Sequence, residues 1–208
     1  MMEPDLPDDH LPQQDLQLRL HALQLRQVAL ADENAARRAA LAQARQLADT
    51  TNFLARVRHT NGEGGIFRAM AQHLAGALGA DYLCIDPAAG DDLPAETLAL
   101  VLDGVAVDGG GERLHEPLCA DLLGDPPHRA VSTVVAGLGQ RFPGLPALQR
   151  FGAQSAVAVT LWSATGAPIG RIVALARRPL AGPAMAASIL ELVAAFVAVE
   201  LEREPEAA

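Results

Sequence analysis

The chain has 208 residues, half of them hydrophobic and only 3% aromatic, with a formal net charge of -9. This length suits one domain of ordinary size plus an extension. All 16 basic residues are arginines, the pI is about 5.0 and aromatic side chains for base stacking are scarce, so we expect no nucleic-acid partner.

The cysteine count and the hydropathy pattern bear on the compartment. Two cysteines in a chain of this length argue against a disulfide scaffold and fit a reducing environment. No basic region followed by an apolar stretch opens the chain, so we expect no signal peptide. The most apolar run, Met185 to Val199, is interrupted by Glu191 and is shorter than the ~20 residues that span a bilayer. We therefore expect a cytoplasmic protein with no membrane partner.

The chain opens with an acidic, proline-containing segment, residues 1–15, which we expect to be disordered. From Leu16 the composition changes, because neither proline nor glycine occurs again until Gly62. Leucine, alanine, glutamine and arginine dominate this stretch, which favours one long helix over residues 16–60.

A heptad repeat fits this predicted helix when Leu20 is placed at an a position. The a series reads Leu20, Gln27, Asn34, Leu41, Ala48 and Ala55, and the d series reads Leu16, Leu23, Leu30, Arg37, Ala44 and Thr51. The first half makes a fair coiled-coil seam and the second half a thin one. Asn34 at an a position favours a parallel dimer, so we expect a homodimer through this helix. The alternative is a helix that packs only on its own domain.

Residues 61–203 carry helical and strand patterns in turn. Apolar spacing predicts a helix from Ile66 to Leu78, ended by Gly79. Strands are predicted at residues 81–86, 96–103, 155–162 and 169–176, with a hairpin turn at 164–167 and a closing helix at 184–202. The middle segment, residues 114–151, has few strong signals and is expected to be irregular, and residues 204–208 to be a disordered tail. The elements predict an α+β fold, a central antiparallel β-sheet flanked by helices and preceded by the long N-terminal helix.

Several short motifs resemble those of GAF domains, the small sensory modules of bacterial signalling proteins. The hairpin formed by residues 152–161 and 166–172 resembles the family's central hairpin, and Arg178-Pro179-Leu180 follows where the family often has the same residues. The segment LHEPLC, residues 114–119, and Phe142-Pro143 fall where a subgroup preceding histidine kinases and diguanylate cyclases carries a Pro–Cys segment and a Phe–Pro pair. The family often has Val-Pro-Leu where this chain has Val159-Thr160-Leu161.

The resemblance implies a ligand pocket, because in GAF domains the ligand lies between one sheet face and the middle segment. The residues it would place there are Tyr82, Cys84, Leu118, Cys119, Val131, Phe142 and Ser155. The alternative is that these side chains fill a collapsed core without a ligand.

Residue patterns for catalysis or metal binding are weak. Cys84 and Cys119 belong to no metal-binding spacing, so we expect no metal and two ordinary buried cysteines. Ala120 follows Cys119 where bilin-attaching relatives carry a Cys-His pair, so we expect no covalently bound chromophore. The chain has no lysine, so the Asn-Lys-Phe-Asp-Glu motif of cyclic-nucleotide-binding members is absent. His115 and Glu116 are expected to point apart on an extended segment.

These observations predict a non-enzymatic sensor of bacterial signal transduction. A dimeric GAF domain would bind a small molecule or a partner and relay binding through helix packing. No output domain follows Arg203, so the output is expected in trans, with a histidine kinase or diguanylate cyclase as the partner that the resemblance implies, or in a larger assembly. The sequence does not identify a cofactor, which stays unknown. The alternatives are a ligand-free dimerisation adaptor and an enzyme resembling free methionine sulfoxide reductase that would use Cys84 and Cys119.

Overall fold

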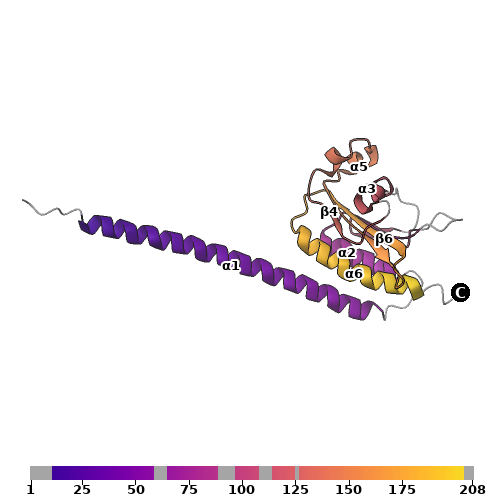
Figure 1. Ribbon diagram of the computed structural model, residues 1–208, viewed down its shortest axis with the longest axis horizontal. Coiled ribbons are helices and arrows are strands. Elements are labelled where there is room, and N and C mark those ends of the chain that lie inside the picture. The colour runs from indigo at the N-terminus through magenta and orange to yellow at the C-terminus, as the bar shows by residue number, and fades with distance from the viewer. Residues whose placement is uncertain (1–10, 59–64, 89–96, 108–113, 125–126, 204–208) are drawn as a thin grey trace, which may run out of the picture. The chain divides into compact units, whose positions relative to one another are not determined.

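The protein is described by a computed structural model over residues 11–58, 65–88, 97–107, 114–124 and 127–203 (Figure 1). The chain divides into two compact units, Met1–Arg45 and Gln46–Ala208, and each is described by itself. Of the two tails expected to be disordered, residues 1–10 and 204–208 lie outside the described residues.

The long N-terminal helix, α1 (Leu11–Val57), begins at Leu11 instead of Leu16. Proline is tolerated in the first turn of a helix, where its missing N–H has no intrahelical partner, so Pro12 does not prevent the earlier start. Within residues 15–45 the large apolar side chains are exposed: Leu16, Leu18, Leu20, Leu23, Leu25, Val28, Leu30 and Leu41. Among these described residues, no large apolar side chain of α1 is buried.

The last three turns of α1 belong to the second unit. Thr50, Leu54 and Val57 are buried there, whereas Ala55 of the heptad seam stays exposed. The second unit begins at Gln46, because one face of α1 supplies side chains to its core.

One antiparallel sheet of six strands forms the centre of the second unit, in the order β3-β2-β1-β6-β5-β4. The strands are β1 (Tyr82–Pro87), β2 (Ala99–Leu102), β3 (Val105–Val107), β4 (Ser132–Val134), β5 (Ser155–Trp162) and β6 (Pro168–Ala176). The expected α+β class with a central antiparallel sheet is confirmed. Sequence patterns missed β3 and β4, since three residues are too few to display alternation.

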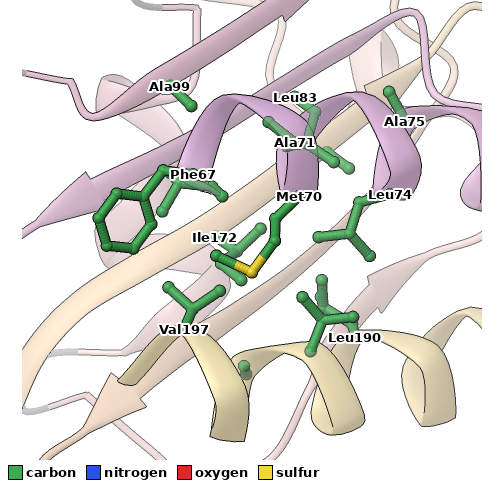
Figure 2. Close-up of a cluster of buried hydrophobic side chains, with 14 of the residues drawn as sticks. Phe67, Met70, Ala71, Leu74, Ala75, Leu83, Ala99, Ile172, Leu190 and Val197 are labelled. Atoms are coloured by element: carbon green, nitrogen blue, oxygen red, sulfur yellow. The ribbon is translucent and has the colours of Figure 1, made fainter. Parts of the chain in front are cut away.

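The first face of the sheet packs against α2 (Gly65–Leu78) and α6 (Pro183–Arg203) (Figure 1). Figure 2 shows Met70 of α2 pointing between Ile172 of β6 and Val197 of α6. All three side chains are fully buried. Removing this apolar surface from water, at about 25 cal/mol per Å², is the main force that joins these layers.

The second face is covered by the middle segment, which is more regular than the sequence predicts. It contains a 3₁₀ turn, η1 (Glu116–Leu118), three short helices and β4. The helices are α3 (Cys119–Leu123), α4 (Leu138–Arg141) and α5 (Pro146–Phe151). Elements of four to six residues are shorter than two helical turns, so they carry no readable helical period, and packing on the sheet determines them.

Two glycines have the roles that their positions predict. Gly166 has a φ of 84° in the turn between β5 and β6, where a side chain would be strained. Gly170 lies so close to β1 that a Cβ atom would sit 2.6 Å from the carbonyl oxygen of Asp86. A side chain at residue 170 would therefore push apart the two strands that carry the polar groups described below.

The closing helix α6 has 21 residues, which corrects the expectation that this apolar segment is too short to cross a membrane. By length and composition it qualifies as a candidate span, with a mean hydropathy of 2.0 over its most apolar window. Its apolar side is occupied within the unit, because Ile189, Leu190 and Val193 are buried against the sheet and α2. Burial in the core accounts for this apolar side, and 39% of the most apolar window is buried within the structure.

Candidate functional site

Three polar side chains form a cross-strand row on the second face of the sheet. Arg171 of β6 is paired directly with Asp86 of β1 on one side and with Thr160 of β5 on the other. Directly opposed residues of an antiparallel pair have Cβ atoms about 5 Å apart, so these side chains are neighbours. Asp86 and Thr160 are 1% and 4% exposed, whereas the side chain of Arg171 is 31% exposed. Arg171, the middle residue of the row, is therefore the member that reaches solvent.

A chain of hydrogen bonds continues from this row to the middle segment. Asp86 Oδ2 lies 2.5 Å from His115 Nε2 and 3.4 Å from Arg171 Nε. The other ring nitrogen, His115 Nδ1, lies 2.6 Å from the Tyr82 hydroxyl oxygen. An ionised carboxylate only accepts, so Nε2 donates to Asp86, and in a neutral ring Nδ1 accepts the Tyr82 proton.

The electrostatics of this chain favour an ionised Asp86. Burial alone would raise the pKa of Asp86, but hydrogen bonds from His115 and Thr97 and the charge of Arg171 outweigh burial and leave the pKa lowered. Burial raises the pKa of Tyr82 strongly, which keeps its hydroxyl protonated. Tyr82 and His115 are both 0% exposed. A substrate cannot reach either group without opening the core. This chain of hydrogen bonds therefore has a structural role and links β1 to the residue that precedes η1.

The two cysteines, Cys84 and Cys119, are buried free thiols close to His115. Burial raises the pKa of Cys119 to about 11, and that of Cys84 lies well above its ordinary value for the same reason. Cys119 Sγ donates to the His115 carbonyl oxygen at 3.3 Å. A thiol is nucleophilic only as a thiolate, so neither group is activated at neutral pH.

Cys84, Asp86 and His115 are the residues of the described chain that could hold a metal ion, because one donor atom of each lies within 4.8 Å of the others. All three are buried. Both ring nitrogens of His115 are already in hydrogen bonds, and the Arg171 guanidinium beside Asp86 repels a second cation. This arrangement favours the hydrogen-bonded chain over a metal centre.

A cavity of about 300 Å³ lies beside two members of the polar row, Arg171 and Thr160. Arg171, Thr160 and Gly170 line it from the sheet, and Cys119 and Leu123 line it from α3. Prolines and alanines complete the wall: Pro87, Ala88, Ala120, Pro127 and Pro168. The lining is thus largely apolar with a cation and a hydroxyl at one side, which is the usual composition of a small-molecule site.

The structure brings together only part of the predicted pocket. Tyr82, Cys84, Leu118 and Cys119 share one buried cluster on the second face, and Phe142 packs at its margin. Among these residues, Cys119 lines the cavity.

Two of the predicted pocket residues lie elsewhere. Val131 packs against the cluster on the first face. The Ser155 hydroxyl donates to the Arg178 carbonyl oxygen at 2.7 Å, two residues beyond the end of β6.

The predicted pocket did not include four residues of the site, namely Asp86, His115, Thr160 and Arg171. His115 was expected on an extended segment, but it precedes η1 with helical backbone angles and turns its ring into the core. A signal for Arg171 and Thr160 was present, because polar residues interrupt two otherwise apolar strands in positions that pair across a short hairpin.

Comparisons with known proteins identify the fold. No protein-family model and no curated protein matches the sequence. The GAF domain of a protein assigned as a sensor histidine kinase from Pseudomonas syringae pv. tomato aligns over 82% of this chain and 93% of its own, with a TM-score of 0.54 and 18% identity. The photosensory core module of a Stigmatella aurantiaca phytochrome aligns over 78% of this chain, with a TM-score of 0.56 and 13% identity.

The phytochrome match is partial, since this chain spans 37% of that photosensory module. The chromophore-binding domain of a bacteriophytochrome from R. palustris is similar over 77% of this chain and 61% of its own, with a TM-score of 0.52 and 12% identity. Identities this low establish the architecture alone. The described part of the chain has a GAF-like α+β fold, preceded by a long helix.

Proposed function

We propose that this chain is a non-enzymatic, cytoplasmic sensor of bacterial signal transduction that binds a small molecule in the cavity beside Arg171. The observation that carries the proposal is the cavity itself, an apolar space with polar groups of the sheet at one side. The fold supports it, because the similar solved structures include a GAF domain of a protein assigned as a sensor histidine kinase. The buried, protonated thiols supply no nucleophile for the cysteine-based alternative.

The proposed sensor is a parallel homodimer formed through α1. The leucines at the a and d positions, Leu16, Leu20, Leu23, Leu30 and Leu41, are 51–69% exposed. Exposed leucines at this spacing are buried when two helices pair. Nearer the domain, α1 uses a different face for its own core, because Leu54 and Val57 are buried while the seam residues Ala48, Thr51 and Ala55 stay exposed. One helix can therefore hold its domain and a second copy at the same time.

The proposed output acts in trans on a partner such as a histidine kinase or a diguanylate cyclase. Helix α1 meets the domain at α2, where the ring of Phe53 stacks on that of His73 with centroids 4.0 Å apart. The Thr50 hydroxyl lies 3.2 Å from His73 Nε2 in the same contact. Ligand binding that shifts α2 would shift the paired helices, which is a helix-packing switch.

Ligand binding is tested by thermal shift on the full chain with panels of nucleotides, amino acids, organic acids and tetrapyrroles. A ligand that binds only the folded state increases the free energy of unfolding by RT ln(1 + [L]/Kd). It must therefore raise the melting temperature. A reproducible, saturable shift supports the sensor. The absence of any shift across the panels would favour the adaptor that dimerises without a ligand.

The dimer is tested by light scattering on Leu23→Glu and on a matched control, Leu25→Glu. Both leucines are exposed on α1, but Leu23 occupies a d position of the seam and Leu25 an f position outside it. We expect the wild type and Leu25→Glu to be dimers at micromolar concentration and Leu23→Glu to shift toward monomer. A wild-type monomer would rule out the dimer and leave the ligand site untouched.

A further inference from the structure

We propose that the cavity beside Arg171 takes a small monocarboxylic acid with an apolar body. This inference rests on the proposed sensor function and names the ligand class of its site.

The guanidinium of Arg171 supplies the first recognition group. Its Nε atom faces Asp86 Oδ2 at 3.4 Å, which occupies one edge of the planar group. Its terminal nitrogens, Nη1 and Nη2, meet no hydrogen-bond acceptor among the residues that the structure describes. The side chain is 31% exposed and lines the cavity. An arginine edge with two unused nitrogens matches the two oxygens of a carboxylate in parallel hydrogen bonds.

The hydroxyl of Thr160 supplies the second recognition group. Thr160 is paired directly with Arg171 across β5 and β6, lines the same cavity and is only 4% exposed. Its Oγ1 atom has no hydrogen-bond partner within the described part of the chain. A buried hydroxyl without a partner costs free energy, which a ligand oxygen placed beside it recovers.

The charge balance favours a single negative charge on the ligand. Asp86 is ionised and already offsets part of the Arg171 charge from the buried side. A phosphate monoester carries close to two negative charges at neutral pH, so it loses far more hydration on entering a largely apolar cavity than one partly offset arginine returns. A carboxylate carries one charge and matches the planar guanidinium edge.

Shape and polarity of the remaining wall define the body of the ligand. Away from Arg171 and Thr160, the wall consists of apolar side chains and glycine, with Pro87, Leu123 and Pro168 the largest apolar groups and Cys119 a protonated thiol. A volume of about 300 Å³ is at the lower limit for ligand sites. The expected ligand is therefore a short aliphatic or single-ring acid and not a nucleotide or a tetrapyrrole.

Calorimetric titration of the full chain with three acids and their amides tests the inference. The probes are propionate, isovalerate and 3-phenylpropionate, each paired with the neutral amide of the same carbon skeleton. Fluorescence of Trp162, the single tryptophan, gives a second readout two residues from Thr160 on β5. We expect at least one acid to bind about tenfold or more tightly than its amide, the strength of a charge-assisted hydrogen bond.

Variants assign the preference to the two residues. Arg171→Gln removes the charge and Arg171→Lys keeps it without the planar fork, so both should lose most of the acid-over-amide preference. Thr160→Val keeps the shape of the side chain and should weaken acid binding several-fold. Arg38→Gln, an exposed arginine of α1, is the matched control and should bind like the wild type. Thermal melting confirms that each variant is folded, and Arg171→Lys with Thr160→Val carries the test if Arg171→Gln does not fold.

Each contrary result overturns the carboxylate assignment in a different way. Amides that bind as tightly as the acids would show that the site does not require a negative charge on its ligand. That result would leave the sensor proposal in place. Acid binding that survives all three site variants would place the ligand elsewhere. No binding by any of the six probes also rejects the inference, and the wider thermal-shift panels then decide separately whether the protein is a sensor.

Discussion

Asp86, His115 and Tyr82 show how one buried hydrogen-bond chain sets the chemistry of the second sheet face. Tyr82, His115 and Asp86 Oδ2 are stabilised in the core by their shared hydrogen bonds, and removal of one partner leaves the next atom orphaned. Two other buried atoms of this face, Asp86 Oδ1 and Thr160 Oγ1, have no partner among the described residues. Of these two residues, only Thr160 lines the cavity, so its hydroxyl is the one available to a ligand there.

Two hydroxyl deletions separate these roles. Tyr82→Phe leaves His115 Nδ1 without its partner, so we expect a loss of about 1–3 kcal/mol in unfolding free energy, measured by urea denaturation. Thr160→Val removes a hydroxyl that has no partner, so stability should be unchanged or slightly higher. Equal losses in both variants would contradict the hydrogen-bond chain.

The lowered pKa of Asp86 predicts how stability depends on pH. A carboxyl whose pKa is lower in the folded state stabilises the protein above its unfolded pKa of about 3.9, and this contribution disappears as pH falls through the folded pKa. We therefore expect Asp86→Asn to be clearly destabilised at pH 7, with the difference from wild type shrinking below about pH 4. The control Asp103→Asn breaks an exposed pair with Arg177 and should change little at either pH. A difference that grows with acidification would refute the assignment.

At the scale of elements, the contact between α1 and α2 joins the long helix to the domain. Phe53 stacks on His73, and the Gln46 side-chain amide donates to the Ala77 carbonyl oxygen at the end of α2. Burial lowers the pKa of His73, although Asp49 acts in the opposite direction. The neutral ring is therefore the form that this contact favours.

Truncation of Phe53 is expected to loosen this contact without unfolding the sheet. Phe53→Ala should cost about 1–3 kcal/mol, less than a fully buried phenylalanine, because the side chain is only half-buried. The matched change Asn52→Ala, on the exposed side of the same turn, should stay within about 0.5 kcal/mol. Hydrogen exchange should show faster opening of residues 46–57 in Phe53→Ala, and unchanged exchange there would contradict the role given to the ring.

Elements differ in how well their sequence predicts them. β5 matches its predicted bounds, and α2, β6 and α6 match within a residue at each end, because each carries a long apolar pattern. The helices of the middle segment were not predicted, because α3, α4 and α5 are too short to show a helical period in their sequence and form only against the sheet. The burial of His115 was not predicted either, since it depends on η1 and not on a local sequence pattern.

For the whole molecule, a dimer through α1 predicts that stability depends on protein concentration. Association favours the folded, paired state by mass action, so the melting temperature of wild type should rise as concentration increases from 1 to 100 μM, on the order of a few degrees. Leu23→Glu should show a flatter dependence, and Leu25→Glu should follow wild type. A wild-type melting temperature independent of concentration would contradict pairing through the seam.

The sequence alone was sufficient for the α+β class, the central hairpin, the long first helix and the burial of both cysteines. These features depend on local period, on glycine geometry and on composition, all of which act over a few residues. Only the tertiary structure joined Asp86, His115 and Arg171 and revealed the cavity beside them. Those residues are far apart in the chain, and a pairing register that no local pattern specifies brings them together.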